Sequence, residues 1–130
     1  ILEENSKNFS MHKRFQHIEN RLKKLYEKAL VIAKKSDKIL FFQYGGDLSI
    51  SADLANQLIY KFPGKTIVVI YVTGAKANIS VRGEKIREAV LKAIEKLVGS
   101  GGGGHENAVG AQIKVEDLEK FRENMKKLIE

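Results

Sequence analysis

The amino-acid sequence predicts an α/β fold, in which helices flank a mixed β-sheet of about five strands and a long helix precedes the sheet. Runs of β-branched and aromatic residues alternate along the chain with stretches whose apolar residues recur every three or four positions. The connection between two of the β-type runs, at Gly74 and Ala75, is so short that these strands should form an antiparallel hairpin. Residues 1–38 are expected to form the helical segment and residues 39–130 the α/β domain.

The N-terminal helix is expected from about Phe9 to Lys35, because its apolar residues follow the spacing of one helix face. The residues of this apolar stripe are Met11, Phe15, Ile18, Leu22, Leu25, Ala29 and Ile32. Ser10 or Ser6 is a candidate cap for the first turn. A single stripe needs a partner surface, which is the domain itself, a second copy in a coiled coil, or a neighbouring domain.

The first half of the domain is expected to contain strands around one helix. The expected strands are Ile39–Tyr44, Asp47–Ile50, Thr66–Thr73 and Lys76–Arg82. Ser51 is the predicted N-cap of the intervening helix, and Pro63 and Gly64 stop that helix after Phe62.

The second half is expected to place a glycine-rich loop between two helices. Gly83 should open a helix whose apolar face holds Ile86, Val90, Ala93, Ile94 and Leu97. After the loop, the alternation from Ala111 to Val115 predicts a short strand. A terminal helix is then indicated by Leu118, Phe121, Met125 and Leu128.

Length and composition exclude several classes of protein. The chain has 130 residues and no cysteine, which excludes disulfide frameworks, thiol catalysis and zinc–thiolate sites. It has no apolar stretch of about 18 residues and no secretory signal pattern, so we expect a cytoplasmic protein without a membrane partner. Because the chain begins with Ile1, we also expect it to be a fragment.

Positive charge is concentrated in residues 7–38. The bases there are Lys7, Lys13, Arg14, Arg21, Lys23, Lys24, Lys28, Lys34, Lys35 and Lys38. The acids there are Glu19, Glu27 and Asp37, so this segment carries the whole formal excess of +7. A basic stripe indicates a polyanionic partner, although a solvated helix face gives the same pattern.

The histidines of the basic segment do not form a metal pair. His12 and His17 lie five positions apart, which separates them by about 140° around a helix axis. We expect both to lie on the surface.

The stretch from Gly101 to Gly110, in which four glycines run into His105, is the most informative part of the chain. Glycine lets backbone N–H groups approach a ligand closely, and successive exposed N–H groups form a concavity that suits a phosphate or a carboxylate. A histidine at the end of such a loop can donate to the same anion. A flexible linker is the alternative, but the residues from His105 to Ile113 are more specific than a linker requires.

Three segments together resemble a known family. Residues 102–110, Gly-Gly-Gly-His-Glu-Asn-Ala-Val-Gly, resemble the Gly-Gly-Gly-His-x-x-Ala-Ala-Gly signature of the DHHA1 domain, with Val109 in place of the second alanine. Residues 79–82, Ile-Ser-Val-Arg, resemble the Ser-x-Arg strand end of that domain, and residues 51–56, Ser-Ala-Asp-Leu-Ala-Asn, resemble its first helix. The likeness covers about residues 39–130 and keeps the order and spacing of the segments.

The resemblance implies the C-terminal substrate-binding domain of DHH-family phosphoesterases, such as RecJ-type single-strand nucleases and oligoribonuclease-type nucleotidases. In that family the long helix connects the catalytic domain to DHHA1. The residues implied to bind substrate are Ser80, Arg82, Gly102, Gly103, Gly104, His105 and Asn107. The metal site for Mn²⁺ or Mg²⁺ belongs to the family's N-terminal DHH domain, so this chain is expected to hold no metal and no catalytic residue.

The residue chemistry fits this role but leaves alternatives open. Ser80 and Arg82 lie two apart on a predicted strand and therefore share a face, where the planar guanidinium suits a phosphate or a base edge. An ion pair with Glu84 or Glu88 is the alternative for Arg82. For His105, a structural bond to a backbone carbonyl is as plausible as contact with a ligand.

The partners implied by the resemblance are single-stranded DNA or RNA, short oligonucleotides, and the N-terminal DHH domain of the same parent. A homodimer through the N-terminal helix stays open. Two other functions also stay open: a tRNA-binding C-terminal domain of the alanyl-tRNA synthetase type, and a protein-interaction domain whose helical stripe recruits a partner.

Overall fold

The computed structural model describes the backbone of residues 2–129 and the side chains of residues 10–129, and it has an α/β fold. The sheet in this part of the chain has five strands in the order β1-β2-β3-β5-β4. The strands are β1 (Ile39–Tyr44), β2 (Thr66–Thr73), β3 (Lys76–Arg82), β4 (Gly101–His105) and β5 (Ala108–Lys114). β1 and β2 pair in parallel and the other pairs are antiparallel, which confirms the predicted mixed sheet.

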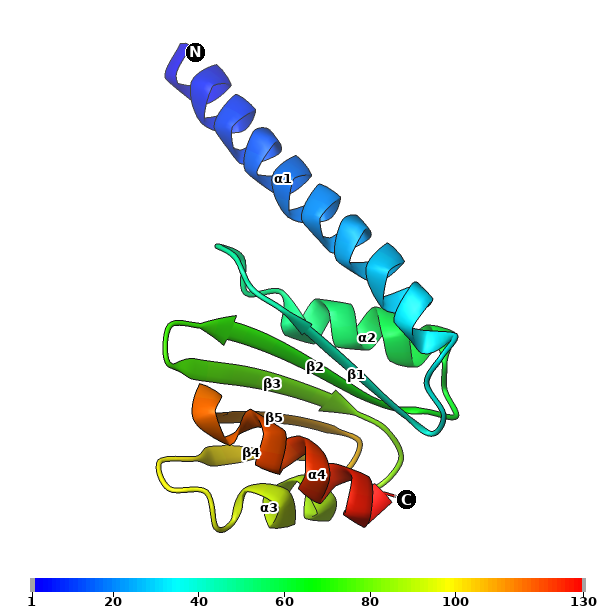
Figure 1. Cartoon of the computed structure of the whole chain (residues 1–130). Coiled ribbons are helices and arrows are strands. Elements are labelled where there is room, and N and C mark those ends of the chain that lie inside the picture. The colour runs from blue at the N-terminus through cyan, green and yellow to red at the C-terminus, as the bar shows by residue number, and fades with distance from the viewer. Residues whose placement is uncertain (1, 130) are drawn as a thin grey trace.

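Helices cover both faces of the sheet (Figure 1). The helices are α1 (Leu2–Ala33), α2 (Ser51–Lys61), α3 (Arg87–Ile94) and α4 (Leu118–Ile129), with a 3₁₀ turn, η1 (Val115–Asp117), before α4. α1 and α2 lie on one face, and α3 and α4 lie on the other. None of the helices formed by residues 2–129 carries the long uncharged apolar run that a bilayer span requires.

Side chains of the inner strand β2 point alternately into two separate cores. Ile67, Val69 and Tyr71 pack with residues of α1 and α2, such as Leu25 in α1. Val68 packs with residues of α3 and α4 on the opposite face. Burial on both faces explains why the sequence of β2 is continuously apolar and not alternating.

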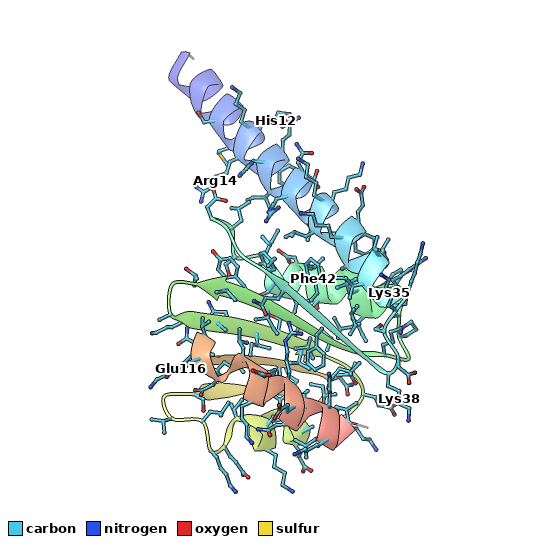
Figure 2. The ribbon with its side chains drawn as sticks, viewed as in Figure 1. His12, Arg14, Lys35, Lys38, Phe42 and Glu116 are labelled. Carbon is cyan, nitrogen blue, oxygen red and sulfur yellow. The ribbon has the colours of Figure 1, made fainter. Side chains whose placement is uncertain are left out.

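Only the C-terminal half of α1 packs on the domain. Leu25, Ala29 and Ala33 are buried, whereas Met11 is 70% exposed in the half of α1 that projects away from the sheet (Figure 1). The same projecting half carries His12 and Arg14 (Figure 2). α1 therefore has one half that packs on the domain and another half that is exposed.

The helix also departs from the expected boundaries and stripe. It begins at Leu2, so Ser10 lies inside it and caps nothing, and the side chain of Ser6 lies outside the described residues. Near its end, Ala33 is buried in place of the expected Ile32. The expected apolar residues recur on average every 3.5 positions or so, whereas a straight α-helix has about 3.6 residues per turn. The apolar stripe therefore drifts slowly around the helix, which accounts for this shift by one position.

The segment Asp47–Ile50 is a connection and not the expected strand. Two tyrosine hydroxyls hold it over the end of the sheet: Tyr44 Oη accepts from the Ile50 N–H at 2.8 Å, and Tyr71 Oη donates to the Gly46 carbonyl at 2.6 Å. Burial raises the pKa of Tyr44 above its usual value, so this hydroxyl stays protonated at neutral pH. The connection leads the chain from β1 into α2 and forms no ladder of its own.

Two predicted helix starts are also wrong. Ser51 is the first residue of α2 and its hydroxyl makes no cap, because it bonds instead to Ser80. α3 begins at Arg87 and not at Gly83, because the chain first makes a turn in which Lys85 has a φ of 51°. Leu97 lies beyond the end of α3, although it still packs against the core.

Candidate functional site

The four glycines that precede His105 form a β-strand and not a loop. Gly101–His105 is β4, the outer strand of the sheet, and it pairs along its length with β5. This pairing holds the glycines in an extended ladder whose successive N–H groups alternate in direction, so the expected concave cradle of successive amides is wrong. β5 is correspondingly longer than expected, starting at Ala108 in place of Ala111.

Two of these glycines are required by packing. A Cβ at Gly104 would collide with the carbonyl oxygen of Ala108, and its φ of 153° is unfavourable for other residues. A Cβ at Gly102 would lie 2.9 Å from the carbonyl oxygen of Gly110 and 3.1 Å from Cδ1 of Ile94 in α3. Gly102 and Gly104 therefore let β4 lie close to its neighbours.

Two other glycines have no such explanation. A Cβ at Gly103 would meet nothing within 4 Å, and a Cβ at Gly110 would meet only the Ile79 carbonyl oxygen, at an ordinary 3.9 Å. Neither residue has a positive φ, and the two are directly paired across β4 and β5. Glycine weakens a strand interior, and where the fold does not need it, it often marks a close approach of a ligand. We call Gly103 and Gly110 the glycine floor.

The glycine floor lies on an open part of the sheet. α2 packs on β2 and β3, while the floor residues on β4 and β5 are exposed. The register continues the row Gly103–Gly110 to Ser80 on β3. On the opposite side of the sheet, Val109 and Ala111 are buried against the α3–α4 core. A ligand can therefore reach the floor only from the side on which α2 lies.

Polar side chains border the floor in the neighbouring rows. Directly paired residues share a face, so the row Arg82–Ala108–His105 places a guanidinium and an imidazole on the same side as the floor, on strands whose backbones are about 10 Å apart. The row beyond the floor holds Asn78 and Gln112, joined by a hydrogen bond of 2.8 Å from Gln112 Nε2 to Asn78 Oδ1. The arrangement is a shallow strip without side chains, bounded by hydrogen-bonding groups.

Arg82 is held by neutral acceptors. Its Nε donates to Asn56 Oδ1 at 2.7 Å and its Nη1 donates to the Val81 carbonyl at 2.9 Å. Among the described side chains, neither Glu84 nor Glu88 forms the ion pair that was the alternative for this arginine. Partial burial lowers the pKa of Arg82 from its ordinary value, yet a guanidinium stays charged at any physiological pH. A partly desolvated cation held by neutral groups is suited to an anionic ligand.

Ser80 and Arg82 also fix α2 on the sheet. The hydroxyls of Ser80 and Ser51 are 3.0 Å apart, and Asn56 bonds to Arg82, so two of the sequence segments that resembled a family are joined by hydrogen bonds. Ser80 is buried beneath this contact. Asn56 is a site residue that sequence reasoning missed, although it closes the segment Ser51–Asn56 that was already recognised.

His105, at the end of β4, also lines a hollow in the surface. This depression has a volume of about 580 Å³ and is lined by Lys85, Arg87, Glu88, Gly104, His105 and Glu106. The lining carries basic and acidic groups together, so it is less selective for an anion than the surroundings of Arg82. His105 is exposed.

Asn107 has a structural role. Its Oδ1 accepts from the Lys85 N–H at 2.9 Å, and its carbonyl oxygen accepts from the Gly83 N–H at 3.1 Å. These bonds hold the turn that precedes α3. The structure thus brings Ser80, Arg82, Gly103 and His105 to one face, turns Gly102 and Gly104 toward packing, and uses Asn107 to support the loop.

Within residues 10–129, no three His, Asp or Glu side chains lie close enough together to hold a metal ion. The chemistry that these residues can provide is recognition of a flat, negatively charged ligand by a guanidinium, an imidazole and exposed backbone.

The DHHA1 domain family matches residues 27–130 of the chain. The matched region includes the three segments that carry the resemblance and begins within the packed half of α1. A comparison with curated protein sequences finds no match.

Solved structures share the fold at low sequence identity. RecJ of Thermus thermophilus, in complex with Mn²⁺, aligns over 88% of this chain with 17% identity and a TM-score of 0.63, and the chain spans 18% of that protein. An exonuclease RecJ bound to manganese aligns over 87% of the chain with 17% identity and a TM-score of 0.61, and the chain spans 30% of it. The C-Ala domain of alanyl-tRNA synthetase from Aquifex aeolicus aligns over 70% of the chain and 89% of its own length, with 16% identity and a TM-score of 0.60.

Proposed function

Because the chain belongs to the DHHA1 domain family, we propose that it binds the end of a single-stranded nucleic acid or a short oligonucleotide as part of a RecJ-like phosphoesterase. The observation that carries this proposal is the glycine floor. Gly103 and Gly110 lack side chains at positions where the fold tolerates them, one row of the sheet away from a partly buried arginine that no carboxylate among residues 10–129 neutralises. A flat ligand with a negative charge satisfies both features together.

In this proposal Arg82 holds a phosphate of the terminal nucleotide. Asn56 and Val81 occupy donors on Nε and Nη1, which fixes the plane of the guanidinium and leaves its remaining donors for the ligand. Preorganisation by these neutral partners reduces the entropy that binding would otherwise cost. The sugar or base lies on the glycine floor, and His105 contacts it from β4.

Hydrolysis is assigned to another part of the parent protein. We propose that a DHH domain outside this chain holds Mn²⁺ or Mg²⁺ and cleaves the phosphodiester, while this chain holds the strand end. Support comes from the fold shared with RecJ structures described with manganese, of which the chain spans less than a third.

The tRNA-binding module of an alanyl-tRNA synthetase is the second candidate. It is favoured by the high coverage of the Aquifex C-Ala domain, of which 89% aligns with this chain. His105 followed by Glu-Asn-Ala-Val-Gly favours the phosphoesterase, because this segment resembles the signature of that branch of the family. A gel shift that compares tRNA with short single strands distinguishes the two: tight binding of tRNA alone would favour the synthetase type.

The direct test compares two arginines of similar environment. Arg82 and Arg122 are both partly buried with a lowered pKa, and both donate to a side-chain amide oxygen, that of Asn56 or of Gln43. Arg122 lies on α4, which packs on the opposite face of the sheet. Calorimetry with a nucleoside monophosphate should show affinity reduced about tenfold to 100-fold for Arg82→Ala, as expected for a hydrogen-bonded charge. Arg122→Ala should bind like the wild type, and equal losses for the two variants would contradict the proposed site.

A further inference from the structure

We infer that a bound single strand continues from Arg82 over α2 and along the seam between α1 and α2, where Tyr60 stacks on a base. We define the α1–α2 seam by two adjoining hollows. The first is lined by Tyr26, Asn56, Gln57 and Tyr60, and the second by Glu19, Asn20, Leu22, Lys23, Tyr26 and Gln57. This inference rests on the proposed function and extends it from a single nucleotide to a strand of several nucleotides.

The seam is continuous with the site at Arg82. Arg82 touches Asn56 through the 2.7 Å hydrogen bond, and Asn56 lines the first hollow, which measures about 410 Å³. The second hollow measures about 310 Å³ and shares Tyr26 and Gln57 with the first. The hydrogen bond to Asn56 and the residues that the two hollows share therefore connect the guanidinium with the flank of α1.

Tyr60 stands at the entrance to this path. Asn56 and Tyr60 are four residues apart on α2 and so lie on the same face of the helix, beside the end of β3 that carries Arg82. The Tyr60 side chain is 91% exposed, so no packing contact explains an aromatic ring here. Stacking on an exposed aromatic ring is the usual means by which proteins bind the bases of a single strand without reading their sequence.

The lining is suited to a nucleic acid more than to an apolar partner. Asn20, Asn56 and Gln57 offer amide groups that can donate to and accept from base edges. Lys23 lies on the α1 side of the path, with Glu19 as the acid in its lining. Further lysines and arginines follow along α1. From residue 7 onward, this helix is part of the basic segment 7–38, which has the formal excess of +7. Charge of this sign complements a phosphate backbone and not an acid-poor peptide.

The experiment separates the first nucleotide from the following ones. The affinities of the full chain for thymidine monophosphate and for an oligothymidylate of about eight nucleotides are measured for the wild type, Tyr60→Phe, Tyr60→Leu and Val98→Ala. Val98 is 78% exposed and lies outside both hollows, so it controls for the loss of an exposed apolar group. Because Tyr60 is exposed, none of these variants should disturb folding.

Stacking predicts a specific pattern. Tyr60→Leu should weaken octanucleotide binding about tenfold, leave monophosphate binding unchanged, and be rescued in Tyr60→Phe, because the ring and not its bulk makes the contact. Unchanged octanucleotide binding in Tyr60→Leu would overturn the seam while leaving the Arg82 site intact. An equal loss for the monophosphate would also overturn it, and absence of any binding by the wild type would remove the proposed function itself.

Discussion

At the scale of single residues, the glycines of β4 and β5 have different reasons for being glycine. Gly104 is required by the backbone, since its φ is positive and a Cβ would strike the neighbouring strand. Gly103, its neighbour in sequence, is open to solvent on the side where a Cβ would stand. Folding therefore requires glycine at position 104 but not at position 103, where the proposed binding of a ligand gives the reason for it.

This difference predicts opposite effects of the same substitution. Gly103→Ala should raise the free energy of unfolding by about 0.5–1 kcal/mol, because alanine loses less backbone entropy in a strand, and yet weaken nucleotide binding. Gly104→Ala should lower the free energy of unfolding by about 1–3 kcal/mol through overpacking. Urea denaturation and calorimetric titration of both variants check this, and a Gly103→Ala protein that binds normally would show that the floor contacts no ligand.

The site residues were only partly readable from the sequence. Ser80 and Arg82 could be predicted to share a face, because alternation along a strand requires it. The bond from Arg82 to Asn56 could not, because it depends on how α2 is placed over β3, which no local pattern encodes. Asn107 was expected to bind substrate, and the bond from the Lys85 N–H to its Oδ1 gives it a structural role that no local pattern reveals.

At the scale of secondary structure, strands and helices with strong periodicity were predicted well. β1, β2 and β3 have the expected bounds, because β-branched and aromatic runs fill them. β4 was expected to be a loop, since a glycine run has no side-chain pattern by which a strand can be recognised. Its strand conformation is imposed by pairing with β5, whose Val109, Ala111 and Ile113 are buried in the core.

The helix α1 combines an anchored half with a projecting half. Leu25 is 1% exposed within the core shared with α2, whereas the side chain of Met11 stands mostly in solvent. The regular apolar stripe gave no sign of where packing would stop, because spacing along a helix does not reveal the extent of the surface beneath it.

The two halves should respond differently to truncation of an apolar side chain. Leu25→Ala should lower the free energy of unfolding by about 2–5 kcal/mol, because it leaves a cavity in the core. Met11→Ala should change it by less than about 0.5 kcal/mol in the isolated chain. Thermal or urea unfolding of both variants measures this. A large loss for Met11→Ala would show that the projecting half has a partner in solution, such as a second copy of the helix.

At the scale of the whole molecule, the basic N-terminal helix and the open glycine floor lie on the same face of the sheet. α1 shares this face with α2 and the glycine floor, and it forms most of the basic segment 7–38 that carries the formal excess of +7. The opposite face is closed by α3 and α4. A strand that starts at Arg82 and leaves along the α1–α2 seam would therefore move toward positive charge, whereas a lone nucleotide would meet only the guanidinium and the imidazole.

The salt dependence of binding tests this arrangement. For single strands, the logarithm of the binding constant falls with the logarithm of salt concentration by about 0.7 per phosphate neutralised. A nucleoside monophosphate, which has no layer of condensed counterions along a strand, should give a slope shallower than about −0.7, and an octanucleotide that reaches Lys23 and other basic residues of α1 should give about −2 or steeper. Lys23→Gln should reduce only the octanucleotide slope, by about 0.7, while Lys127→Gln on α4 makes the same change of charge on the closed face and should leave both slopes unchanged. If the two lysine variants lower the octanucleotide slope equally, net charge and not a path along α1 governs the attraction, and the strand must leave the glycine floor in another direction.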